Sequence, residues 1–282
     1  MEEKTIVITG IGVSTSISDN YEELVECIKN NTYNRHSRGN DILDAVAEKF
    51  GRNACRRMDN FTLYSLMSAY NAIENSKLDL DNEDKTRIGT IYSTIWGPAY
   101  TTNNYFEPVI KAGAKGVSPL LFPYTVTNAA LGAVARMTGL SGVSTMLVES
   151  SAIEFSCGQI KDGKADVIVC GATEFLTPLI KEFGFDNELN VPFDGAVSLV
   201  LETKEHAMNR DTHIYAEISC NSSIYSQSLQ HESMFSCDLL SFEQIVSVIY
   251  YIVYGMDPEE SLVSRIGEKC FNTIKMVKKY EK

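Results

Sequence analysis

The chain has 282 residues, of which 44% are hydrophobic and 22% charged, and its formal net charge is −12. This composition is typical of a globular protein with enough chain for one large or two small domains around a packed core. The acidic balance argues against binding to a nucleic-acid backbone, which requires clustered Lys and Arg.

Two features argue against export and membrane insertion. The start of the chain, MEEKTIVITG, carries acidic residues where a signal peptide needs basic ones. The longest apolar stretch, residues 245–255, is too short to span a bilayer. We therefore expect a cytoplasmic protein with neither a membrane nor a nucleic-acid partner.

The cysteines do not form a recognisable framework. There are seven, an odd number, and no two of them form a C-x-x-C pair. This spacing favours free thiols in a reducing compartment over disulfides or a zinc site. We expect neither a metal nor a cofactor.

The first part of the chain predicts a buried strand followed by a helix. Residues 4–13 read as a strand that enters a glycine turn at Gly10 and Gly12. These give G-x-G without the third glycine, which is a weak indication of dinucleotide binding. Residues 56–78 form an amphipathic helical pattern with four apolar residues at core spacing: Phe61, Leu66, Ala69 and Ile73.

The next segments predict a strand, a long loop and a helix. Residues 87–97 read as a strand that ends at a loop. Residues 107–139 contain a loop interrupted by prolines, followed by a helix from about 128 to 137.

The middle of the chain, residues 144–174, predicts strand, turn, helix and strand. Met146 to Val148 form a short apolar strand, and the chain turns at Glu149, Ser150 and Ser151 into a helix that ends at Asp162-Gly163. A second strand, 166–170, stops at Gly171. Several enzyme folds place a nucleophile at such a turn, because the amide N–H groups at a helix N-terminus stabilise negative charge.

The remaining segments continue the alternation of strands and helices. We expect a strand at 196–203, a polar hinge at 204–213, a strand at 214–220, a linker at 221–237, an apolar helix at 241–255 and a closing strand pair about Gly267. This alternation predicts an α/β protein with a largely buried sheet.

The order of these segments resembles the β-ketoacyl-acyl-carrier-protein synthases, which have the layered thiolase fold. The resemblance rests on VITGIGV, RRMDNFTLYSLMSAYNAIENSKL, KGVSPLLFPYTVTNAALGAVARMTGLSG, IKDGKADVIVCGATE and PFD…AVSLVLETKEHA, within about residues 4–218. Weaker similarity follows in 241–255 and near the end. It implies an intact N-terminal half at 1–210 and a reduced C-terminal half at 211–282 that completes the sheet.

In that family a cysteine at the strand–helix turn carries the acyl chain, because a thiolate attacks a thioester readily. Here the turn holds Glu149, Ser150 and Ser151, and the nearest cysteine, Cys157, lies within the following helix in register with Ile153 and Ile160. We interpret Cys157 as a core thiol and the serines as helix caps. The sequence predicts no catalytic residue at this degenerate turn.

The family also uses two histidines, which stabilise the charge that develops during condensation. The N-x-H-G-T motif is absent, and MFSCDLLS stands where a G-H pair would precede the late helix. Of the four histidines, we place His36 in a polar loop and His206 and His213 on the solvated surface. His231 falls in the expected linker. The loop around VPFDGAVSLVLE also lacks a glycine-rich insertion that closes the family's active site.

The resemblance therefore points to a degenerate synthase subunit like the chain-length factors of type II polyketide and aryl-polyene systems. Such a subunit forms a heterodimer with a full-length ketosynthase, shapes its acyl tunnel, and meets acyl carrier protein only through that partner. The expected interface and tunnel residues are Tyr105, Phe106, Leu121, Phe122, Tyr124 and Asn128. Two alternatives remain open: a residual acyltransferase or decarboxylase that uses Ser150 with His231, and a homodimeric acyl-binding protein.

Overall fold

The computed structural model describes residues 4–30, 32, 42–148, 150–176, 194–220, 240–255 and 274–279. The expected linker at 221–237 and the region around Gly267 lie outside these residues. None of the described helices has both the length and the apolar character that crossing a bilayer requires.

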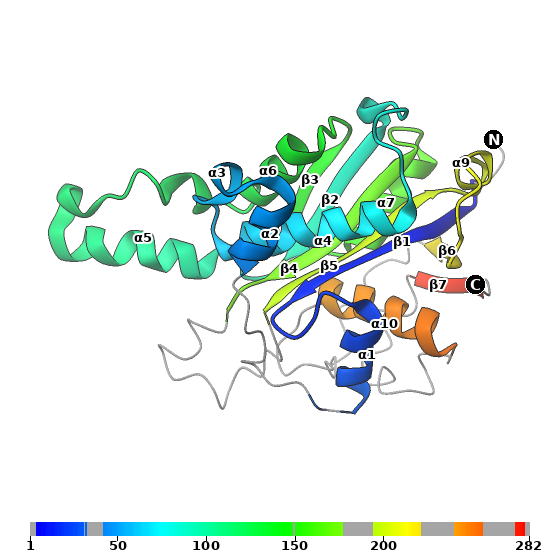
Figure 1. The fold of residues 1–282 in the computed structure, drawn as a ribbon, viewed down its shortest axis with the longest axis horizontal. Helices are drawn as coiled ribbons and strands as arrows, with labels where there is room; N and C mark the ends of the chain where they lie inside the picture. Colours follow the sequence, from blue (N-terminus) through cyan, green and yellow to red (C-terminus); the bar gives the residue numbers. More distant parts are fainter. Residues whose placement is uncertain are drawn as a thin grey trace, which may run out of the picture.

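Seven strands of the described chain form a single sheet in the order β3-β2-β4-β5-β1-β6-β7 (Figure 1). The neighbours β3, β2 and β4 are parallel, whereas β5, β1, β6 and β7 pair antiparallel. The strands are β1 (Ile6–Thr15), β2 (Ile88–Thr94), β3 (Ser144–Val148), β4 (Val167–Glu174), β5 (Gly195–Thr203), β6 (Ala216–Cys220) and β7 (Ile274–Lys279). The expected α/β fold class is confirmed.

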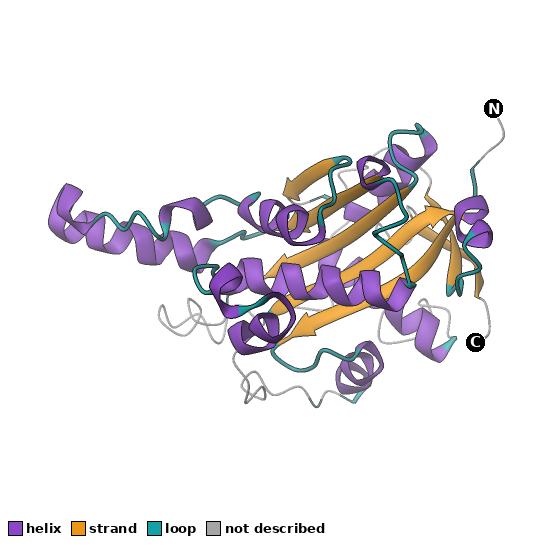
Figure 2. Ribbon diagram, turned by 45° about the horizontal axis from the view of Figure 1, so that its top comes forward, coloured by secondary structure: helices purple, strands orange, loops and turns teal. Residues whose placement is uncertain are grey.

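Helices cover both faces of the sheet (Figure 2). The face under α4 (Asn60–Ser76) is completed by α2 (Ile42–Phe50), α3 (Arg52–Cys55) and α6 (Ala129–Thr138). The opposite face is covered by α1 (Tyr21–Lys29), α7 (Ala152–Lys161) and α10 (Leu240–Tyr254). The short helix α9 (Lys204–Asn209) follows β5.

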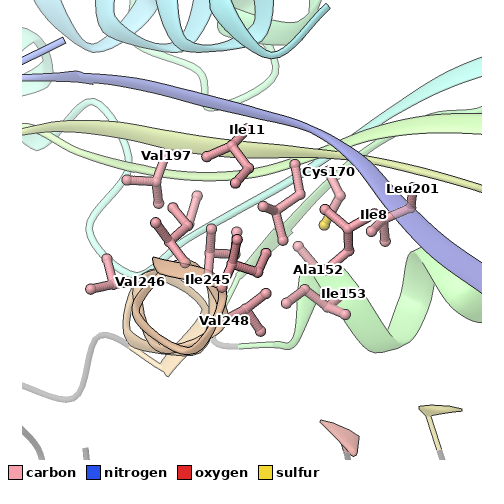
Figure 3. Close-up of a cluster of buried hydrophobic side chains, with 14 of the residues drawn as sticks. Ile8, Ile11, Ala152, Ile153, Cys170, Val197, Leu201, Ile245, Val246 and Val248 are labelled. Carbon is pink, nitrogen blue, oxygen red and sulfur yellow. The ribbon is translucent and has the colours of Figure 1, made fainter. Parts of the chain in front are cut away.

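Successive residues of the central strands enter different cores, as the period of two in a strand requires. In β4, Val167 and Val169 belong to the core under α4, whereas Ile168 and Cys170 belong to the core under α7 and α10. Figure 3 shows Cys170 with Ile153 of α7 and Ile245 of α10 in this second core. Burial on both faces explains why the strands read as continuous apolar runs.

The two glycines of the G-x-G pattern lie inside β1, and the expected glycine turn is wrong. A Cβ on Gly12 would lie 2.1 Å from the carbonyl oxygen of Ser68, and one on Gly10 would lie 2.4 Å from that of Ala72. These glycines let α4 pack directly against β1. Close contact between helix and strand therefore accounts for the two glycines.

Three expected boundaries are also corrected. β4 continues past Gly171 to Glu174, because Gly171 leaves room for the ring of Tyr92. The loop expected around Pro108 is instead largely helix α5 (Ala99–Ala112), which contains that proline. The expected hinge at 204–213 begins with α9, because Thr203 caps it by accepting a hydrogen bond from the backbone N–H of His206 at 3.2 Å.

Candidate functional site

The carboxyl ends of the three parallel strands meet at one end of the sheet. β2 ends at Thr94, β3 at Val148 and β4 at Glu174, and β5 begins beside Glu174 at Gly195. Ligand sites in open α/β sheets lie outside the carboxyl ends of the strands. We call it the carboxyl end of the sheet.

At the turn between β3 and α7, the side chain of Ser151 has two structural hydrogen bonds. Its Oγ accepts from the backbone N–H of Glu154 at 3.2 Å, which caps α7, and donates to Oε1 of Gln244 in α10 at 2.6 Å. The Oγ of Ser150 donates to the carbonyl oxygen of Val148 at 3.2 Å. Glu149 lies outside the described residues. The expected cap is confirmed for Ser151.

Cys157 occupies the position in α7 that its register predicted. It is 1% exposed and belongs to the same core as Ile153 and Ile160. A thiol enclosed in this way cannot reach an acyl group at the turn, and its interpretation as a core thiol is confirmed.

His206 lies away from the turn. His206 follows β5, whose last residues pair with the first residues of β4, at the opposite end of the sheet from Ser151. Strand β5 has nine residues, so these ends are roughly 25 Å apart. His36 and His231 lie outside the described residues.

The prediction that His206 and His213 are solvated surface residues is wrong. The Nδ1 of His206 lies 2.5 Å from Oε2 of Glu202 and its Nε2 lies 3.2 Å from Oε2 of Glu83, with the side chain 24% exposed. His213 is half-buried and packs edge-on against the ring of Tyr215, with 4.6 Å between the centroids. Helix α9 forms where a hinge was expected and brings His206 against the buried Glu202 carboxylate.

Helix α5 and the chain that returns from it, residues 98–128, form an arm that projects from the body of the molecule (Figures 1 and 2). The arm includes the short helices η2 (Gly113–Gly116) and η3 (Phe122–Tyr124), and Thr101 is the buried residue of α5. A Cβ on Gly116 would lie 2.1 Å from the carbonyl oxygen of Pro108, so the returning chain runs close against the helix.

The structure divides the expected interface residues into two groups. Tyr105 and Tyr124 are half-buried: the Tyr105 ring lies 5.8 Å from that of Phe122, and Tyr124 packs against the core under α4. Leu121 is also half-buried. Phe106 and Phe122 are 50% and 58% exposed, and Asn128 is exposed at the start of α6.

Sequence reasoning missed further apolar side chains around the arm. Ile110 is 82% exposed, one helical turn after Phe106, so the two share the outer surface of α5. The other exposed apolar residues of the arm and of the loop before it are Trp96, Val117, Leu120 and Val126. Their only sequence signal was a high apolar content in a segment rich in Pro and Gly.

Three contacts hold the base of the arm. The buried carboxylate of Glu174 accepts hydrogen bonds from the backbone N–H groups of Ile95 at 2.5 Å and Trp96 at 3.3 Å. Thr101 donates to Oδ2 of Asp59 at 2.6 Å, and the ring of Tyr100 packs edge-on against Phe175 with 5.6 Å between centroids. These contacts join the arm to β4 and to the start of α4.

Burial, with a smaller contribution from the negative charge of Asp194, raises the pKa of Glu174 to about 8, against the opposing effect of the hydrogen bonds from Ile95, Trp96 and Thr94. The described residues contain no group of three or more His, Cys, Asp and Glu side chains that could hold a metal ion.

Residues 3–188 match the family model described as the N-terminal domain of β-ketoacyl synthase. The chain belongs to the β-ketoacyl synthase family. This β-ketoacyl synthase homologue is 24% identical over 258 residues to the 3-oxoacyl-[acyl-carrier-protein] synthase 2 of Vibrio cholerae. It is 25% identical over 261 residues to the granaticin polyketide putative β-ketoacyl synthase 1 of Streptomyces violaceoruber. The alignments cover 77% and 76% of this chain, and the chain spans 62% of the length of each relative.

Solved structures place the synthase homologue in the thiolase fold. One match is a chain from the structure of a type II polyketide synthase acyl-carrier protein in complex with its ketosynthase. The TM-score is 0.65 and the identity 23%, and the match covers 77% of this chain and 67% of that one. The synthase homologue also matches the ishigamide ketosynthase/chain length factor with a TM-score of 0.61 and 16% identity, covering 77% and 68%. At these identities the matches establish the fold, and the expected thiolase-like architecture is confirmed.

Proposed function

We propose that this protein is a non-catalytic, chain-length-factor-like partner of an active ketosynthase in type II fatty acid or polyketide biosynthesis of a polyene-like kind. It binds the full-length ketosynthase as a heterodimer and helps to shape the tunnel that holds the growing acyl chain. Acyl carrier protein meets the complex through the active partner.

The observation that carries the proposal is the arm. Its outer surface presents Phe106 and Ile110, half and more than four-fifths exposed, on a helix of which little is buried within the chain. A helix of 14 residues is marginally stable in water without packing on its apolar side. Large exposed apolar patches mark interaction sites. The arm is therefore suited to being covered by a second subunit.

The strand β3 supports the same conclusion. It lies at the edge of the described sheet, next to α6, and its Val148 is 54% exposed. An unpaired sheet edge is a site where another chain can add a strand. A partner that pairs with β3 lies close to α6, the helix into which the arm leads.

The turn supports a non-catalytic role. The Oγ of Ser151 caps α7 and donates a hydrogen bond to Gln244, so the serine at the start of the helix has a structural role. The alternative enzyme would use Ser150 with His231, a residue outside the described chain. The structural neighbours include an acyl-carrier protein in complex with its ketosynthase and a ketosynthase/chain length factor.

The test is co-purification of the tagged chain with a full-length ketosynthase from the same gene neighbourhood. We expect a one-to-one complex by size exclusion with light scattering. Ile110→Asp should weaken it by a hundredfold or more, because hot-spot contacts contribute about 2 kcal/mol or more and a buried unpaired carboxylate adds to the loss. Val148→Lys should weaken it at the edge strand.

Met208→Asp is the matched control. Met208 is also apolar and 66% exposed, but it lies on α9 at the other end of the sheet. The control should bind as the wild type does. A chain that forms only its own dimer would support the acyl-binding alternative, and a monomer that ignores the ketosynthase would contradict the proposal.

A further inference from the structure

We propose that Glu174 is the positioning residue of the arm: the ionised carboxylate fixes the loop at Ile95–Gly97 from which the arm grows, and its protonation loosens that loop. The part of this proposal that concerns partner affinity rests on the proposed function. The part that concerns the loop does not.

The carboxylate of Glu174 lies where the end of β2, the end of β4 and the loop at Ile95–Gly97 meet. Oε1 of Glu174 accepts from the N–H of Ile95 at 2.5 Å and from Oγ1 of Thr94 at 3.1 Å, and Oε2 accepts from the N–H of Trp96 at 3.3 Å. Thr94 Oγ1 in turn accepts from the N–H of Gly97 at 2.8 Å. The loop that starts the arm is therefore held by two side chains at the ends of β2 and β4.

This arrangement depends on the charge state of the carboxyl group. An ionised carboxylate offers acceptor sites on both oxygens, whereas a protonated one must place its O–H hydrogen and accepts more weakly at that oxygen. Protonation therefore weakens the hold on one of the two N–H groups. Glu174 is 3% exposed, so water does not readily replace the lost bond.

Among the described residues, the charged group that acts on Glu174 is the carboxylate of Asp194, which favours the protonated form. Asp194, just before β5, accepts from the N–H of Leu176 at 2.7 Å, and its charge raises the pKa of Glu174. Asp59, at the start of α4, binds Thr101 at the base of the arm. The elements packed on β4 carry further titratable side chains, which include Tyr64, Tyr70 and Glu74 of α4, Glu154 and Lys161 of α7, Tyr250, Tyr251 and Tyr254 of α10, Tyr92 of β2 and Glu202 of β5. A pKa near 8 places the change within the physiological range.

The chain contains a built-in reporter of this loop. Trp96 is the only tryptophan of the sequence, its backbone N–H is bound by Glu174, and its side chain is 45% exposed. Tryptophan fluorescence of the isolated protein, titrated between pH 6 and 9.5, therefore follows the loop without any partner.

We expect an emission change with a midpoint near pH 8 in the wild type and none in Glu174→Gln, which keeps the shape but cannot ionise. Asp194→Asn should move the midpoint to lower pH, because it removes the charge that raises the pKa. Identical titrations of the wild type and Glu174→Gln would overturn the proposal. If Glu174→Gln does not fold by circular dichroism, an unmoved midpoint in Asp194→Asn would overturn it instead.

The second measurement is the dissociation constant of the ketosynthase complex at pH 6.5 and pH 9. We expect binding by the wild type to be at least about fivefold tighter at pH 9, the lower range of ordinary coupling between sites, and binding by Glu174→Gln to change less. A fluorescence transition without any complex would refute the proposed function and leave the role of Glu174 in the loop intact. A complex whose affinity has the same pH dependence in both proteins would refute the role of Glu174 in partner binding.

Discussion

The side chains of Ser151 and Gln244 bind each other across 93 residues of sequence, with 2.6 Å between Oγ and Oε1. This bond joins the first turn of α7 to α10 on the same face of the sheet. The same Oγ caps α7 through the N–H of Glu154. The serine at the turn where the family resemblance led us to look for a nucleophile thus connects two helices.

The first prediction is that the protein does not take up acyl groups. Incubation with acyl-loaded or malonyl-loaded acyl carrier protein should leave its intact mass unchanged and release no carbon dioxide, because the turn lacks a thiol and Cys157 is enclosed in the core. A mass increase that maps to Ser150 or Cys157 would contradict this expectation.

Replacing Ser151 should cost stability. Ser151→Ala removes the cap of α7 and leaves the amide of Gln244 without this donor, so we expect the free energy of unfolding in urea to fall by about 1–3 kcal/mol. Ser150→Ala is the neighbouring control and should change it by no more than about 0.5 kcal/mol. Equal effects of the two variants would show that Ser151 has no special structural role.

The glycines of β1 make a further test. Gly12→Ala places a Cβ 2.1 Å from a backbone oxygen of α4, and we expect a loss of about 3 kcal/mol or more, or no folded protein. Gly132→Ala in α6 is the control, because no atom outside the local backbone of α6 lies within 4 Å of the added Cβ. That variant should gain up to about 1 kcal/mol from helix propensity. Urea unfolding of both variants measures the contrast, and a tolerated Gly12→Ala would contradict it.

His206 should make stability depend on pH. The hydrogen bond to Glu202, with the charges of Glu202 and Glu83, raises the pKa of His206 above its ordinary value, so the folded state holds the proton more tightly than the unfolded chain. Its stabilising contribution is complete below the unfolded pKa of about 6.5 and is lost as the pH rises through the folded value. Thermal unfolding should therefore show a smaller fall in Tm from pH 6 to pH 9 in His206→Gln than in the wild type.

Ionisation of Glu174 also makes stability fall as the pH rises. Its raised pKa means that the folded state holds the proton more tightly than the unfolded chain between about pH 4.5 and pH 8. The double variant His206→Gln/Glu174→Gln separates the two groups. A slope in His206→Gln equal to that of the wild type would contradict the role of His206.

The last prediction concerns product length. If Phe106, Phe122 or Tyr124 closes the end of the partner's tunnel, a longer acyl chain has to overpack against that side chain, which costs about 1–3 kcal/mol. Replacing the side chain by Ala removes this cost. The ratio of neighbouring products should then change by roughly tenfold. Product analysis of the reconstituted complex should show longer chains for at least one variant whose heterodimer yield is unchanged. An unchanged distribution from all three would mean that the subunit supports its partner without measuring the chain.

Much of the fold followed from local pattern in the sequence. The runs that became β4 and β5 are mostly apolar because both faces of the sheet are covered. The helical spacing in α4, α7 and α10 places one apolar side on that sheet. Ser151 as a cap and Cys157 as a core residue followed from their positions beside and within α7.

Other features depended on contacts between residues far apart in sequence. Whether Gly12 makes a turn or admits a helix is decided by Ser68, 56 positions later, and whether His206 is solvated is decided by where α9 places it relative to Glu202 and Glu83. The projection of Ile110 from the arm and the hold of Glu174 on Ile95 and Trp96 likewise have no local signature. Periodicity reports which side of an element is apolar, whereas burial, charge state and exposure are set by what the rest of the chain places against that side.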